Sequence, residues 1–276
     1  MLTMSHRQPT DGEIRQRIME IEDEEYRLLY MYQYEVLGRI SEVAGKYMPH
    51  RDDHVFLEVE GEEFVMFVVK TAKRKGMLRP CGRPLDTKYD PWAKEIVDYI
   101  ESSDEYPFSL HENVSTSKTY AMNRAKQVFD GLYWPFSEYT RSVPYSYTPD
   151  LVKTERWNDR GYREYLVIFP DGQRSWTTDK EVVYIGEKVN PRWKPMTSHA
   201  LRKVASQTLR FNYGFDDVDD AYFGGWTISQ KSGVSQAMNK HYMYMDLRET
   251  TAALPQLEQI FRRYAKKLLI SYSLFL

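Results

Sequence analysis

The sequence contains one cysteine, Cys81, in 276 residues. A single thiol cannot form an intrachain disulfide, which excludes a disulfide-stabilised secreted scaffold and favours a reducing compartment. The chain also lacks any apolar run near the length of about 20 residues that a membrane-spanning helix requires. Residues 1–26 lack the apolar core of a secretion signal. We therefore expect an intracellular, cytoplasmic protein with no membrane partner.

An excess of charge of one sign is also missing. The chain has 38 Lys+Arg and 40 Asp+Glu, a formal net charge of −2, which by itself does not indicate nucleic-acid binding. The distribution is uneven, because residues 70–79 hold five basic residues and no acidic one, whereas acids gather at 20–25 and 216–220. Such runs are most often solvated surfaces, so the composition permits DNA binding without requiring it.

What the sequence has in abundance is tyrosine, with 22 residues. Tyrosine suits a DNA-facing surface, and it also suits a core in which each hydroxyl finds a partner. Both interpretations stay open. The hydrophobic share of 42% and the charged share of 28% are those of a globular protein.

Hydrophobic spacing predicts an α+β fold. Residues 55–70 predict two strands joined through Gly61-Glu62, a hairpin whose apolar second strand leaves Lys70 at its far end. Residues 131–195 are rich in turn signals and predict an irregular loop followed by a hairpin, with strands 164–169 and 181–186 around Asp171-Gly172. The predicted helices cover 12–47 (with Gly38 ending one helix or allowing close packing), a segment from Pro91, 115–130, 199–212, 218–223, 234–246 and 253–270.

Several local features could carry chemistry, although each alone has an ordinary structural explanation. Arg39 and Glu42, spaced three apart, could be a surface ion pair. Lys70 lies where a strand ends and a basic turn begins. His199 and Arg202 share one face at the start of a helix, the end that favours anions. Further along, Gly225-Trp226 is followed by Asn239-Lys240-His241-Tyr242.

In chain order these features resemble the active site of the tyrosine recombinase (lambda-integrase) family. The resemblance covers about residues 20–250 and is most specific in Gly38-Arg39-Ile40-Ser41-Glu42 and His199-Ala200-Leu201-Arg202. It implies a mostly helical catalytic domain over residues 1–276, with a small antiparallel sheet, a β-rich insertion at 131–195 and a C-terminal helix and docking tail at 247–276. The implied catalytic residues are Arg39, Lys70, His199, Arg202, Trp226 and Tyr242.

The chemistry suits a phosphodiester. Arg39 and Arg202 could clamp the non-bridging oxygens, whose charge grows during attack. Tyrosine, with a solution pKa of about 10, needs its proton removed or its anion stabilised before it attacks, and His199 could accept that proton. The resemblance implies that Lys70 protonates the leaving 5′-oxygen and that Trp226 donates its indole N–H to the phosphate. Tyr242 would form a 3′-phosphotyrosine. No cofactor or metal is required.

The sequence departs from the family pattern in several places. About 38 residues precede Arg39, too few for the family's N-terminal core-binding domain, which is therefore expected to be absent. Tyr242 lies sixteen positions after Trp226, a longer gap than usual, which makes Tyr244 a rival nucleophile. Lys73 is a similar rival for Lys70. The 131–195 insertion could contact DNA, a partner subunit or nothing.

The resemblance predicts a site-specific DNA recombinase or integrase. Its expected partners are double-stranded DNA carrying recombination sites and further copies of the chain, as a tetramer on DNA. A type IB topoisomerase or a telomere resolvase would share nearly the same active-site residues. A non-catalytic DNA-binding protein with this fold is the remaining alternative, against which the presence of the whole residue set argues.

Overall fold

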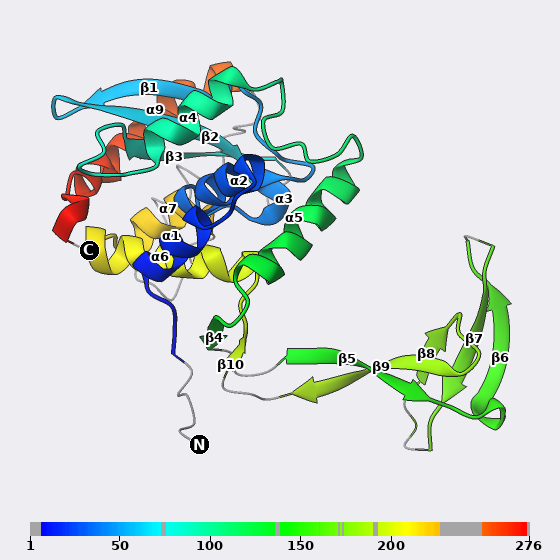
Figure 1. Ribbon diagram of the computed structural model, residues 1–276. Helices are drawn as coiled ribbons and strands as arrows, with labels where there is room; N and C mark the ends of the chain where they lie inside the picture. Colours follow the sequence, from blue (N-terminus) through cyan, green and yellow to red (C-terminus); the bar gives the residue numbers. More distant parts are fainter. Residues whose placement is uncertain are drawn as a thin grey trace. The chain divides into compact units, whose positions relative to one another are not determined.

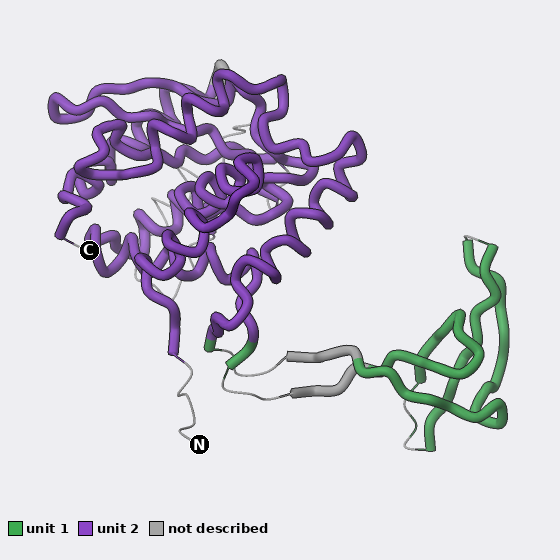
Figure 2. Tube along the Cα trace, viewed as in Figure 1, with its two compact units in different colours: residues 1–6, 135–194 green, residues 7–134, 195–276 purple. Residues whose placement is uncertain are grey.

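The structure is a computed structural model that describes residues 7–72, 76–135, 139–159, 161–170, 172, 174–189, 193–226 and 250–274. Two compact units are distinguished (Figure 2), one formed by residues 135–194 and the other by residues 7–134 and 195–276. The mixture of helices with small antiparallel sheets confirms the α+β class. The recombinase fold itself stays a prediction. In the part of the chain described, no helix combines the length and apolarity needed to cross a membrane.

The larger unit contains one three-stranded sheet and most of the helices, and the short pair of β4 with β10 includes the residues at which the chain passes between the units (Figure 1). Its elements are α1 (Asp11–Met19), α2 (Glu24–Glu35), α3 (Ile40–Val43), β1 (His54–Val59), β2 (Glu62–Lys70), β3 (Leu78–Pro84), α4 (Ala93–Ser102), α5 (Val114–Val128), β4 (Tyr133–Pro135), β10 (Trp193–Pro195), α6 (Ser198–Tyr213), α7 (Asp217–Gly224) and α9 (Thr250–Ala265), followed by the 3-10 turns η3 (Lys266–Leu268) and η4 (Tyr272–Leu274). The helix predicted at 234–246 lies outside the described residues.

The predicted helix over residues 12–47 is wrong as one continuous element, because the segment forms three helices. The alternative that a helix ends at Gly38 agrees with the end of α2 at Glu35. Asp23 begins α2 by accepting a hydrogen bond from Tyr26 N at 3.2 Å, a side-chain cap that a continuous helix would exclude. At the other end, Leu37 adopts a left-handed conformation with φ 50°, and Gly38 N donates to Gln33 O at 2.9 Å. A left-handed leucine costs about 1–2 kcal/mol, so the surrounding structure must hold it in place.

The hairpin predicted at residues 55–70 is confirmed, with its turn one residue earlier, at Glu60 and Gly61, which both have positive φ. Strand β2 pairs antiparallel with β1 and β3, and Lys70 lies opposite Leu78. Residues 64–69 of β2 are buried on both faces of the sheet. Helix α9 packs against β2 and β3. Lys70 is thus the last residue of a strand whose central residues are enclosed.

The tyrosines of α2 lie in the core. Tyr30, Tyr32 and Tyr34 are each no more than 1% exposed. Tyr30 donates its hydroxyl to Ala121 O at 2.6 Å, and Tyr34 donates to Asp11 Oδ1 at 2.7 Å. Because these hydroxyls have partners, burying the rings carries no unpaired polar group. For this helix the core interpretation of the tyrosine content is therefore the correct one.

The C-terminal tail packs on its own chain. Tyr272 is 8% exposed, its N–H donates to Lys88 O at 2.8 Å, and its hydroxyl donates to Asp11 Oδ2 at 3.2 Å. Leu274 remains 74% exposed. The predicted docking tail thus has a partner within the chain at Tyr272.

The smaller unit is a set of antiparallel strands around its own small core. Strands β5 (Tyr139–Ser146) and β9 (Val182–Val189) pair with each other, while β6 (Val152–Trp157), β7 (Arg163–Ile168) and β8 (Arg174–Thr177) form a second sheet. The core is Tyr147, Val167, Phe169 and Val183. The predicted hairpin of 164–169 with 181–186 is wrong, because β8 intervenes and β9 pairs with β5, a strand hidden in the sequence by Pro144.

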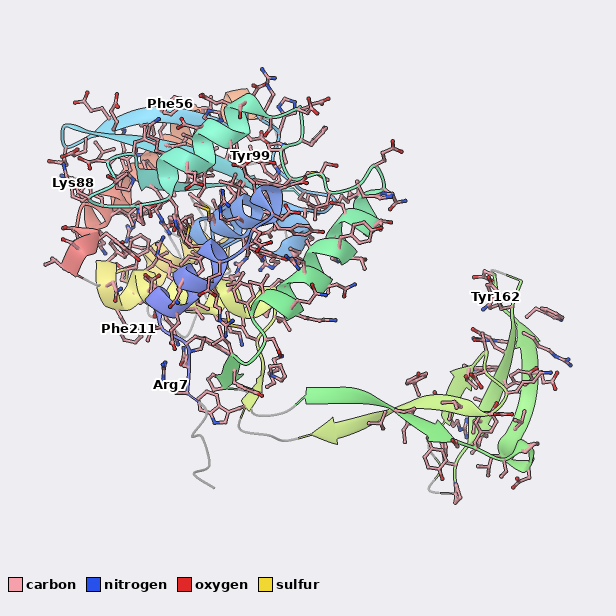
Figure 3. The ribbon with its side chains drawn as sticks, in the orientation of Figure 1. Arg7, Phe56, Lys88, Tyr99, Tyr162 and Phe211 are labelled. Carbon is pink, nitrogen blue, oxygen red and sulfur yellow. The ribbon has the colours of Figure 1, made fainter. Side chains whose placement is uncertain are left out.

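Two aromatic side chains project from the β6–β7 hairpin. Trp157 is 71% exposed and Tyr162 is 62% exposed; Tyr162 is labelled in Figure 3. Arg156 stacks over the Trp176 ring at 4.0 Å and pairs with Glu164 at 2.8 Å. The arginine charge is therefore balanced within the sheet.

A buried charge network in the larger unit links α1, α2, β3 and the segment before α4. Arg15 Nη2 lies 2.8 Å from Glu35 Oε1, and Arg83 Nε contacts both Glu35 and Asp90. Burial and the neighbouring Glu35 raise the pKa of Asp90 to about 7. Burial alone would raise the pKa of Glu35 as well, but Arg15 and Arg83 bring it below its usual range. The pair thus holds one proton, on Asp90, at mildly acidic pH.

We expect Asp90→Asn to flatten the pH dependence of stability. In the unfolded chain Asp90 loses its proton near pH 4, whereas the folded protein keeps it to about pH 7. The folded state binds more protons in between, so its stability falls with rising pH by about 1.4 kcal/mol per pH unit from this group. Asparagine keeps the oxygen that accepts from Trp92 N and Ala93 N and cannot titrate. Urea unfolding at pH 5, 6 and 7 measures the difference.

The control for this prediction is Asp98→Asn, on the exposed side of α4, where the carboxylate pairs with Lys94 at 2.9 Å. This variant should follow the wild-type pH profile. Parallel wild-type and Asp90→Asn profiles would show that Asp90 ionises normally in the folded protein.

Candidate active site

The candidate site is organised around one buried carboxylate, Glu42 of α3, which is fully enclosed. Its Oε1 accepts from Arg39 Nη1 at 2.6 Å and from Ala72 N at 2.9 Å, and its Oε2 accepts from Arg39 N at 3.0 Å. Arg79 Nη2 lies 3.4 Å and Arg202 Nη1 3.5 Å from Oε2. Glu42 therefore contacts three segments far apart in the sequence: the start of α3, the β2–β3 hairpin and α6.

A buried glutamine joins the segment of Arg39 to the segment of His199. Gln33 Nε2 donates to Gly38 O and to Ser198 O, each at 3.1 Å. The two acceptors are the residues immediately before Arg39 and His199. The end of α2 and the beginning of α6 are thus held side by side by one fully buried amide.

Helix α6 presents His199 and Arg202 to different environments. His199 is exposed in the first turn, whereas Arg202 is 2% exposed. The Arg202 guanidinium donates to Gly224 O and lies 4.8 Å from the centre of the Trp226 ring. The structure therefore places Arg202 against Trp226, and places Arg39 and Arg202 on the same carboxylate, Glu42.

Gly225 is required for this placement of Trp226. Its φ is 64°, the left-handed conformation that ends α7. A Cβ at this position would lie 2.7 Å from Arg79 Cδ and 2.9 Å from Thr71 Cγ2. Glycine is thus needed both for the turn and for the close approach of Arg79.

Arg79 of β3 is the member of the site that sequence reasoning missed. It is 3% exposed and donates to Val36 O at 2.8 Å, to Leu37 O at 3.4 Å and to Phe223 O. These bonds hold the left-handed end of α2 and the end of α7. The sequence shows Arg79 only as one of several cations in a basic run, and no signal marks it as buried.

Lys70 is the last residue of β2. It is partly exposed, and its Nζ donates to Asp53 Oδ2 at 2.7 Å. Two residues later, Ala72 N donates to Glu42. The end of β2 is therefore fixed to the carboxylate that also holds Arg39.

The described residues of this cluster carry unbalanced positive charge. Arg39, Arg79 and Arg202 surround one carboxylate, Glu42. Burial would raise the pKa of Glu42, but Arg79 and the N–H groups of Arg39 and Ala72 lower it, so Glu42 stays ionised. Burial together with Arg79 and Arg39 lowers the pKa of Arg202 to about 9. An added anion would relieve this repulsion.

The Cys81 thiol in the same cluster adds no negative charge. Burial raises its pKa to about 11, so it stays protonated at neutral pH. It donates to Phe223 O at 3.2 Å. A thiol that is buried and protonated is a packing residue rather than a nucleophile.

The proposed nucleophile Tyr242, its rival Tyr244 and the rival lysine Lys73 lie outside the described residues. Within the described ranges, no three His, Cys, Asp or Glu side chains gather as a metal site. The functional geometry available is therefore that of Arg39, Lys70, His199, Arg202 and Trp226.

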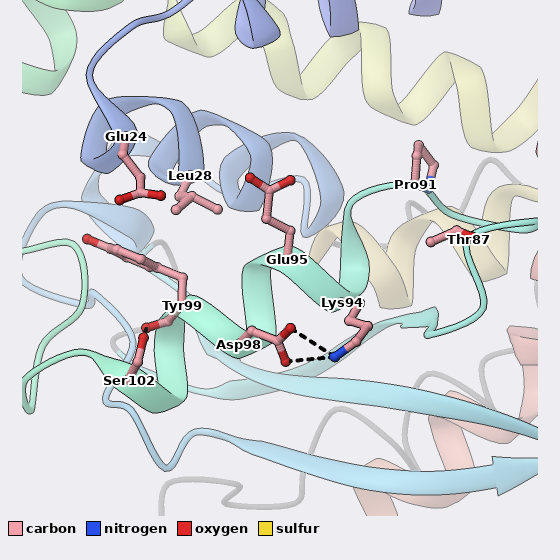
Figure 4. Close-up of a pocket in the computed structure, with 9 residues that line it drawn as sticks. All are labelled: Glu24, Leu28, Thr87, Pro91, Lys94, Glu95, Asp98, Tyr99 and Ser102. Atoms are coloured by element: carbon pink, nitrogen blue, oxygen red, sulfur yellow. Dashed lines mark hydrogen bonds and ion pairs between the residues drawn. The ribbon is translucent and has the colours of Figure 1, made fainter.

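An open surface pocket of about 520 Å³ lies between α2 and α4 (Figure 4) and contains none of these residues. Its lining includes Glu24, Glu95 and Asp98, with Lys94 paired to Asp98 at 2.9 Å. Carboxylates predominate, so the pocket repels a phosphate.

Comparisons with models of protein families, with curated protein sequences and with solved structures found no match for this chain.

Proposed function

We propose that the chain cleaves and rejoins DNA strands through a 3′-phosphotyrosine intermediate, as a site-specific recombinase or integrase. The observation that carries the proposal is the gathering of Arg39 and Arg202 on Glu42 in a cluster with unbalanced positive charge. A phosphodiester in this place would supply the missing negative charge, and two guanidiniums could hold its non-bridging oxygens.

The other residues then have complementary tasks. His199, exposed at the start of α6, would accept the nucleophile's proton. Trp226, already stacked against Arg202, would donate its indole N–H to the phosphate. Lys70 would protonate the leaving 5′-oxygen. Tyr242 would attack phosphorus, and reversal of the same steps would rejoin the strand.

Double-stranded DNA is the proposed substrate, and a tetramer on paired DNA sites is the proposed working assembly. The smaller unit, with Trp157 and Tyr162 exposed, is available for contact with DNA or with another subunit. Dependence on paired sites distinguishes a recombinase from a topoisomerase, which would relax a supercoiled plasmid of any sequence.

The expected result is a covalent protein–DNA adduct that depends on Tyr242. Wild type and Tyr244→Phe are incubated with a pool of nicked duplexes of random sequence, in which loss of the strand beyond the nick traps the intermediate. Both should form adduct on a denaturing gel, and sequencing of the trapped DNA gives the site. Tyr242→Phe should form none, because phenylalanine lacks the attacking oxygen.

The outcomes distinguish a wrong choice of nucleophile from a wrong proposed function. Adduct that survives Tyr242→Phe but disappears in Tyr244→Phe would show that Tyr244 is the nucleophile. Absence of adduct from the wild type, with DNA still retained on a native gel, would instead favour a non-catalytic DNA-binding protein.

A further inference from the structure

Asp53 is a buried carboxylate outside the residue set that the resemblance implies. It is 9% exposed and ends the tight turn that precedes β1. Its N–H donates to His50 O at 2.9 Å, and its Oδ2 accepts from His50 N at 2.8 Å. Its carbonyl accepts from Val68 N of β2 at 2.8 Å. Both the backbone and the side chain of Asp53 are therefore fixed, to the turn and to the strand that carries Lys70.

The same carboxylate oxygen holds Lys70. The Nζ–Oδ2 distance is 2.7 Å, and the lysine side chain is 32% exposed. A free lysine side chain samples many rotamers, and ordering it costs up to about 2 kcal/mol. A rigid carboxylate offsets that loss. An ammonium group has three N–H donors, so one can bind Asp53 while two remain for a substrate.

The neighbouring side chains of the turn contact carboxylates other than Asp53. On the same turn, His50 Nδ1 lies 3.3 Å from Asp52 and Nε2 lies 3.5 Å from Glu105. Arg51 Nε lies 3.7 Å from Asp52. The imidazole and the guanidinium of the turn thus lie beside other carboxylates, while Asp53 pairs with the lysine at the end of β2.

We propose that Asp53 is the positioning residue for Lys70, an inference that rests on the proposed function. Tyr242 Oη forms the new bond to phosphorus, and the bond from phosphorus to O5′ breaks with its electron pair going to O5′. The phenol proton of Tyr242 passes to His199, and a proton passes from Lys70 Nζ to O5′. Asp53 keeps the ammonium aimed at that oxygen and returns the amine to the same place for rejoining.

The test compares Asp53→Asn with wild type on two nicked substrates, ordinary DNA and DNA whose bridging 5′-oxygen is sulfur. A thiolate leaves without a proton, so cleavage of the sulfur substrate does not need Lys70. Asp53→Asn is expected to slow adduct formation on ordinary DNA by about 10- to 100-fold, part of the usual contribution of a general acid. On the sulfur substrate it should stay within about threefold of wild type, which also shows that the variant is folded.

Two further variants sharpen the test. Lys70→Ala should show the same pattern with a larger loss on ordinary DNA. Asp52→Asn, on the same turn but 76% exposed, should behave as wild type on both substrates. Equal slowing of both substrates by Asp53→Asn, or no slowing of either, would overturn the inference while leaving the proposed function intact. Absence of adduct from wild type on both substrates would overturn both.

Discussion

Replacing Glu42 with alanine is expected to lower the free energy of unfolding by about 3–5 kcal/mol, the usual result of removing one partner from a buried charge cluster. Arg79 and Arg202, at 3% and 2% exposure, would lose their counter-charge. The N–H groups of Arg39 and Ala72 would lose their acceptor. Glu42→Gln keeps the acceptor and loses the charge, so an intermediate loss is expected. Guanidinium unfolding followed by circular dichroism measures all three proteins.

The matched control is Glu58→Ala, which removes an exposed carboxylate from β1. This variant should stay within about 0.5 kcal/mol of wild type. A Glu42→Ala protein within about 1 kcal/mol of wild type would mean that the arginines do not depend on Glu42.

The second large effect is expected on chemistry. Arg202→Lys should reduce the rate of covalent adduct formation by about 100- to 1,000-fold, the usual effect of losing a transition-state donor. Lysine keeps a positive charge but lacks the planar fork that can reach Gly224 O and stack on Trp226 while binding a phosphate oxygen. Single-turnover assays on nicked DNA measure the rate, and circular dichroism checks that the helices are intact.

Arg210→Lys is the matched control, on the same helix as Arg202. Its side chain is 41% exposed and pairs with Asp217 and Asp220, away from Glu42. Adduct formation should be unchanged. Wild-type rates in Arg202→Lys would remove Arg202 from the proposed phosphate clamp.

The elements that were predictable are those whose signals are local. The β1–β2 hairpin follows from two strand-like segments joined by a turn with Gly61. Helix α6 follows from Thr197-Ser198 as N-cap residues, and it ends at Gly214 with φ 65°. The pairing of β9 with β5 was not predictable, because Pro144 conceals the strand and its partner lies about 40 residues away in sequence.

The helix breaks in the first 47 residues show a second limit of prediction from local sequence. Asp23 is a recognisable cap, but Leu37 is a poor choice for a left-handed position. It is held there by Arg79 of β3, which donates to Leu37 O. No sequence pattern near Leu37 indicates a hydrogen bond to a residue 42 positions later.

By itself, the sequence determined the α+β class, since hydrophobic periodicity is a property of short segments. Arg39, Lys70, His199 and Arg202 were selected by the resemblance to the recombinase family and not by spacing alone. Only the tertiary structure decided that Glu42 is the centre of the cluster, that Arg79 is buried in it, and that Asp53 holds Lys70. The physical reason is that burial turns a charge that is unremarkable on a surface into one that must be paired. That pairing comes from β3 and from the turn before β1, segments that meet Glu42 and Lys70 only after the chain has folded.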